Sequence, residues 1–218
     1  PTPTPTGFWT GVSFVDNATT LAKAAVMFAS RNPTATEYSA VAAGGDAALR
    51  STIRSYMAGP TFDAFLDESG ETVFLPQGVT TYQMGFGISE VDFPSLTAVL
   101  DGLRANNNAL RTRFNTSVQR EGIELLKYIA KNDKPWTDMV AGNYTVMNGL
   151  LSGYFGASLD GAFVNPNDDK EWRKGTWKSE RLGGVREHAG VLSTHAWLNR
   201  FPTTETNRNR QRARVYFL

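Results

Sequence analysis

Short amphipathic segments separated by glycine and proline constrain this chain more than any other feature. In each segment apolar residues recur every three to four positions, which is the spacing of one face of an α-helix. The first such stripe consists of Leu21, Ala24, Ala25 and Phe28. Asn32-Pro33 interrupts it, and Thr34 with Glu37 forms the capping box of a second helix. The pattern predicts a mainly α fold.

Further segments continue the pattern along the chain. Gly44-Gly45 ends the second helix, and Asp46 begins a third, which Gly59-Pro60 closes. A long helix is predicted over 111–131, and Asn143 is expected to cap another over 144–156. The inward face of the long helix is predicted to consist of Phe114, Val118, Ile123, Leu126 and Ile129 or Tyr128.

Glycine and proline also divide the chain into parts. Residues 1–16 begin with alternating Pro and Thr, which predicts an extended tether. Residues 17–92 are expected to form an N-terminal helical lobe that ends in a Gly/Pro-rich connection from residue 70, and 93–218 a C-terminal helical lobe. Strand is expected only as short pieces near 73–82 and 182–191. The predicted fold is therefore two helical lobes joined by a Gly/Pro-rich loop, with minor short strands.

Composition excludes several classes of protein. The 22 Lys and Arg against 21 Asp and Glu leave a net charge of +1, so no nucleic-acid partner is expected. The absence of cysteine excludes disulfides, thiolate nucleophiles and covalent c-type haem in this chain. No apolar run reaches about 18 residues, so no membrane span is expected.

The two histidines of the chain, His188 and His195, are spaced to share one face of a helix and could ligate a metal or haem. The alternative is a pair of surface or interface histidines. Neither lies near a serine in a G-x-S-x-G context, and no catalytic residue is predicted.

Residues 157–181 form a long polar segment that is expected to be a functional loop. Its oxygen donors Asn165, Asn167, Asp168 and Asp169 are the candidate metal ligands, with calcium as the metal, because hard cations prefer such groups. A solvated turn without metal is the alternative. Trp172 and Trp177 are candidate partner contacts, whereas Trp136 and Trp197 are expected to pack in the core.

The last helix is predicted over 205–218 and ends in four consecutive large apolar residues. Such a run is expected to pack against a partner protein, a second copy of the chain, or a downstream segment of the same protein. The predicted contacts are Arg208, Arg212, Tyr216, Phe217 and Leu218.

Two blocks, 136–156 and 181–218, together resemble the uncharacterised bacterial domains that accompany planctomycete-type c cytochromes. Segments 21–41 and 47–66 resemble the R-PT-E helical module of the same proteins, with Arg31, Pro33, Thr34 and Glu37 at its motif. The first block matches at Asn143, Tyr144, Thr145, Val146, Asn148, Leu150, Tyr154 and Gly156. The second matches at Arg186, Gly190, Val191, Leu192, Leu198, Pro202, Thr203, Arg208 and Arg212.

The resemblance implies an extracytoplasmic protein, in the periplasm, on the outer surface or secreted. In the family the chain usually continues into a C-x-x-C-H segment that binds haem, which this sequence lacks. The chain is therefore expected to hold no cofactor itself, with c-type haem in a downstream segment or a partner. The expected function is a non-catalytic helical module that scaffolds or docks a c-type cytochrome or surface redox assembly. The alternatives are a structural subunit of an extracellular assembly, or the haem-lacking part of a redox or polysaccharide-active enzyme.

Overall fold

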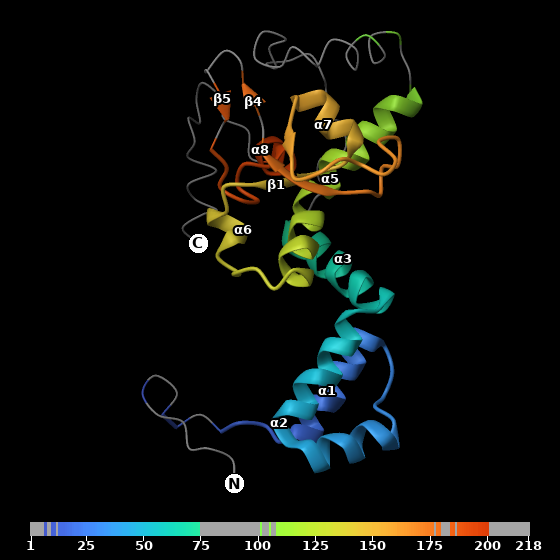
Figure 1. The fold of residues 1–218 in the computed structure, drawn as a ribbon, viewed down its shortest axis with the longest axis vertical. Helices are drawn as coiled ribbons and strands as arrows, with labels where there is room; N and C mark the ends of the chain where they lie inside the picture. The colour runs from blue at the N-terminus through green and yellow to red at the C-terminus, as the bar shows by residue number, and fades with distance from the viewer. Residues whose placement is uncertain are drawn as a thin grey trace. The chain divides into compact units, whose positions relative to one another are not determined.

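The computed structural model describes residues 13–74, 108–176, 178–179, 184–185 and 187–200, with residues 7, 10, 11, 101 and 105. The described part is mostly helical, as the amphipathic pattern predicts (Figure 1). The chain forms two compact units, Pro1–Glu68 and Ser69–Leu218. The division falls inside helix α3, whereas the sequence placed it near residue 92. Of the predicted tether over 1–16, residues 13–16 are exposed and precede helix α1 (Asn17–Ala29), and residues 1–6 lie outside the described residues. The Gly/Pro-rich connection beyond residue 74 lies outside them as well.

The N-terminal unit is built on helices α1 (Asn17–Ala29) and α2 (Ala35–Met57), which pack side by side (Figure 1). The side chain of Asp16 caps α1 by accepting the Thr19 N–H. Gly45 has non-helical backbone angles, with φ +58°, so α2 consists of two helical stretches joined at a kink, and the predicted break at Gly44-Gly45 is confirmed. The core combines the two helices through Leu21, Ala25, Val41, Leu49 and Tyr56.

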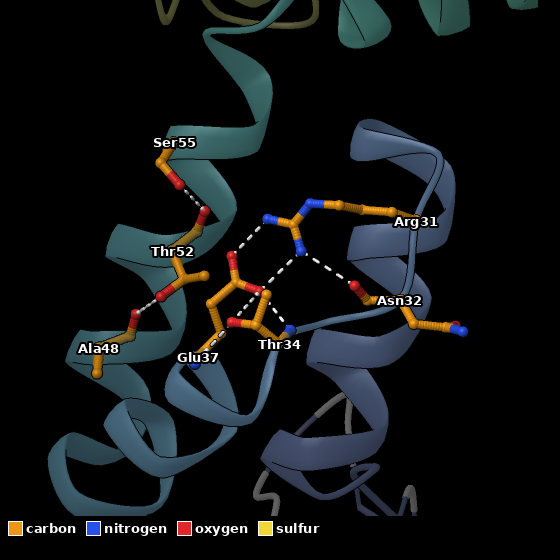
Figure 2. Close-up of polar contacts among 7 residues, drawn as sticks. All are labelled: Arg31, Asn32, Thr34, Glu37, Ala48, Thr52 and Ser55. Atoms are coloured by element: carbon orange, nitrogen blue, oxygen red, sulfur yellow. Dashed lines mark hydrogen bonds and ion pairs between the residues drawn. The ribbon is translucent and has the colours of Figure 1, made fainter.

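The predicted capping box is present where α1 turns into α2. The Thr34 hydroxyl accepts the Glu37 N–H, and the Glu37 carboxylate accepts the Thr34 N–H at 2.7 Å. The two terminal nitrogens of Arg31 donate to the two oxygens of the same carboxylate, at 2.6 and 2.8 Å (Figure 2). The Arg31 hydrogen bonds hold the pKa of Glu37 well below its usual range. The R-PT-E motif residues therefore close a tight turn between two helices.

Thr34→Ala should cost the N-terminal unit about 1 kcal/mol, because the unpaired N–H groups of the first turn lose their side-chain acceptor. The measurement is urea unfolding of the full chain followed by circular dichroism. Thr36 is an exposed threonine of the same helical turn, so Thr36→Ala is the matched control and should stay within about 0.5 kcal/mol. Equal losses in the two variants would contradict the cap.

Helix α3 (Pro60–Phe74) is longer than the sequence indicates. Gly70 was expected to begin a loop, yet the helix continues through it. A Cβ at Gly70 would lie 2.9 Å from a side-chain carbon of Ile123, so this glycine permits close packing on helix α5. The predicted strand at 73–82 is wrong at its start, because Val73 and Phe74 are helical, and its remainder lies outside the described residues.

Helix α5 (Asn108–Lys131) is the centre of the C-terminal unit. It contacts α6 (Asp138–Ala141), α7 (Gly149–Phe155), α8 (His195–Arg200) and strand β1 (Thr145–Met147). Five of its predicted inward residues are buried: Phe114, Val118, Ile123, Leu126 and Ile129. The core cluster combines Phe114 and Val118 with Met147, Leu151 and Tyr154.

Three short strands form an antiparallel sheet in the order β1-β3-β2, with β2 at Ser158–Leu159 and β3 at Arg173–Thr176. A second pair joins β4 (Lys178–Ser179) to β5 (Gly184–Val185), which confirms a strand within 182–191. The helix predicted over 144–156 is wrong at its start, because Thr145–Met147 pairs with Arg173–Gly175. The helix begins after Asn148, whose side chain accepts the Leu151 N–H.

Candidate functional site

Three of the four candidate metal ligands in the polar segment accept hydrogen bonds from protein groups. Asp169 accepts two hydrogen bonds from Arg113, at 2.7 and 2.8 Å. Asn165 accepts the N–H of Asn167, and Asp168 accepts the N–H of Lys170. Among the residues that the structure describes, no group of three or more His, Cys, Asp or Glu could hold a metal ion. These contacts support a folded turn, and calcium at this segment stays a prediction.

The tryptophans are placed differently from expectation. Trp136 was expected in the core, but 68% of it is exposed, and Val140 on the following turn is 47% exposed. Trp136 precedes α6 in a four-residue turn that ends at Met139, and Met139 alone faces the core. Trp172 was expected to contact a partner; it is half-buried and packs against the Phe114 cluster, and a partner contact there stays a prediction. Trp177 and the predicted contacts Arg208, Arg212, Tyr216, Phe217 and Leu218 lie outside the described residues.

The two histidines are not on one helix. His188 lies in an extended segment, and His195 begins α8. Of the alternative of surface or interface histidines, the surface placement is wrong, because both side chains are buried. The backbone N–H of His188 donates to the Asn143 side chain at 2.7 Å. Asn143 therefore fixes this segment and does not cap a helix.

A buried carboxyl, Glu121 of α5, lies beside His195. Its side chain is 1% exposed. The Thr145 hydroxyl donates to Glu121 Oε1 at 2.8 Å, and the His195 backbone N–H donates to Oε2 at 3.2 Å. His195 Nδ1 is 4.0 Å from Oε2, beyond hydrogen-bond distance. One carboxyl thus connects α5, β1 and α8.

Burial governs the electrostatics of this cluster. Desolvation raises the pKa of Glu121 to about 7, although the Thr145 and His195 hydrogen bonds act in the opposite direction. Desolvation lowers the pKa of His188 to about 4 and that of His195 to about 3, where the His188 charge lowers it further. Both histidines are therefore neutral near pH 7, whereas Glu121 changes from the neutral acid to the carboxylate around that pH.

Sequence reasoning missed Glu121, although a signal was present. Glu121 follows Phe114 by seven residues and Val118 by three, which places it within the apolar stripe of the long helix. A carboxyl at such a position must be buried, and a buried carboxyl needs partners. The partners lie on distant segments, so the sequence alone cannot name them.

The two blocks that carry the family resemblance meet in space. The N–H of Gly190 donates to the Gly142 carbonyl at 3.0 Å, and that of Val191 to the Met139 carbonyl at 2.8 Å. Asn143 of the first block also accepts the backbone N–H of His188, which belongs to the second. The matched residues named here build one packed unit.

No family model, curated protein or solved structure matches the chain. Within the described residues, no helix combines the length and apolar character needed to cross a bilayer.

Proposed function

We propose that this chain is an extracytoplasmic, non-catalytic helical module that docks a c-type cytochrome within a surface redox assembly. The location and the cytochrome both follow from the motif resemblance. The described matches to that motif, among them Thr145, Asn148 and Gly190, serve packing and hydrogen bonding inside the C-terminal unit. Motif residues that hold the unit together support a structural role for the module. To dock a partner, such a module also needs an exposed contact surface.

The observation that carries the proposal is the exposed indole of Trp136. A tryptophan buries more apolar surface on association than most side chains, and it is enriched among the residues that dominate binding energy. Val140, four residues along the chain, is also exposed, and the exposed Lys131, Asp133 and Lys134 precede Trp136 in the sequence. A haem edge presents an apolar porphyrin rim and carboxylate propionates, which suits an exposed indole in a segment that also carries lysines.

The experiment is a calorimetric titration of the full chain with a soluble c-type cytochrome. Trp136→Ala should weaken binding about thirtyfold or more, the equivalent of about 2 kcal/mol for a central aromatic contact. Tyr38→Ala is the control, because Tyr38 is an exposed aromatic residue of the other unit. Equal affinity of the Trp136 variant and the wild type would reject this surface. Absence of heat with the wild type would reject the docking function.

A further inference from the structure

Glu121 is fully buried, which is rare for an acidic side chain in a stable core. It lies on α5, and Val118 and Leu125, about one turn away on either side along the helix, are buried too. It has two hydrogen-bond partners, one on β1 and one at the first residue of α8. A fully buried carboxylate with only two donors is poorly compensated for its lost hydration, so the neutral acid is favoured.

Other charged groups around α5 are already engaged elsewhere. Arg120 pairs with Glu124 on α5, and Asp138 of α6 accepts from Tyr144. Arg173 and Lys174 of β3 pair with Glu171 and Asp160, Tyr154 of α7 packs on Phe114, and Glu187 is exposed. Among the described residues, the titratable side chain beside the carboxyl is His195, whose Nδ1 is 4.0 Å from Oε2, and the charge of His188 acts on His195 in turn. Both are buried, so neither offers a ready positive charge.

We propose that Glu121 is a proton-operated latch: as the neutral acid it holds α8 against α5 and β1, and its ionisation favours release of α8. The contact that breaks is the hydrogen bond from the His195 N–H, where α8 begins. Release lets the carboxylate reach water, which replaces the His195 donor and restores the hydration that burial removes. The pKa of about 7 sets the transition near neutral pH.

The latch gives the proposed module a means of regulation. Helix α8 leads directly into residues 201–218, for which the sequence predicts partner contacts. A proton-dependent α8 would make that contact respond to local acidity, as at a surface where redox reactions release protons. This extension rests on the proposed function, but the latch itself is testable on the chain alone, without a cytochrome.

The test compares wild type with Glu121→Gln by amide hydrogen exchange at pH 6 and 8.5, corrected for the intrinsic rate. The amides of His195 and Leu198 report α8, because they donate to Glu121 and to the Thr194 carbonyl. Their protection in wild type relative to the variant should fall about tenfold between the two pH values. The histidines are common to both proteins, so their titration cancels in this ratio.

Ser152 of α7 serves as the internal control, since its amide donates to Asn148 and does not touch α8. Its ratio should stay constant. A constant ratio at His195 and Leu198 would overturn the latch. An equal fall at Ser152 would also overturn it, because Glu121 would then act on the whole unit. If Glu121→Gln does not fold, Glu121→Met, which fills a similar volume without charge, carries the same comparison.

Discussion

Gly190→Ala should destabilise the C-terminal unit by more than about 3 kcal/mol, enough to leave much of it unfolded. Gly190 has φ +50°, which costs an L-residue about 1–2 kcal/mol. A Cβ there would lie 2.2 Å from the Met139 carbonyl oxygen and 2.5 Å from its carbon. These are backbone atoms, so relief requires separating two segments that the Gly190 and Val191 hydrogen bonds hold together.

The matched control is Gly153→Ala in α7. Gly153 is exposed and has no heavy atom within 4 Å of the added carbon. That variant should gain about 0.5–1 kcal/mol, because alanine favours a helix over glycine. Urea unfolding of both proteins measures the difference. A Gly190→Ala protein within about 0.5 kcal/mol of wild type would contradict the close approach of the two motif blocks.

The buried histidines should make the chain sensitive to acid, most clearly when Glu121 is neutralised. A histidine whose pKa is depressed on folding contributes stability above its unfolded pKa of 6.5, and this is lost as pH falls toward the folded values of about 4 and 3. On acidification from pH 8 to 5, the contribution of each histidine to the free energy of unfolding should fall by about 2 kcal/mol. Glu121→Gln should therefore lose about 4 kcal/mol over this range.

The free energy of unfolding of the wild type should fall less over the same pH range, because the contribution of Glu121 to stability rises on acidification while that of the histidines falls. The folded pKa of Glu121, about 7, lies above the unfolded 4.5, so its contribution is complete below pH 4.5 and is lost as pH rises through 7. Acidification from pH 8 to 5 therefore restores part of the stability that the two histidines lose, and the net loss from the cluster is smaller than in Glu121→Gln.

Urea unfolding at the two pH values measures both proteins. Glu187→Gln is the control, because Glu187 is an exposed carboxyl of the same unit. Its profile should follow wild type. Identical pH profiles for wild type and Glu121→Gln would show that Glu121 ionises normally.

The helices were the most predictable part of the fold because their signals are local. The capping box of Thr34 and Glu37 and the stripe from Phe114 to Ile129 are each contained in one segment, and both are confirmed. Gly70 shows where a local signal misleads. The glycine was expected to end the helix, but its function is to allow close packing against Ile123.

The strands and the buried cluster depended on distant partners. Thr145–Met147 is a strand because Arg173–Gly175 pairs with it, and helical spacing in the same stretch gave no sign of that. The β-branched Thr145 and Val146 were the available hint. Glu121 likewise meets His195 only after the chain folds, which is why the sequence could locate an acid in an apolar stripe but not its partners.

Sedimentation velocity of the full chain mixed with a soluble c-type cytochrome tests the central claim most directly. Detection at the haem absorption band follows the cytochrome alone, because this chain contains no cysteine to hold a covalent haem. We predict that the haem signal shifts to a faster boundary with wild type and less so with Trp136→Ala. A haem boundary that sediments as free cytochrome at every concentration of wild-type chain would contradict the proposed function.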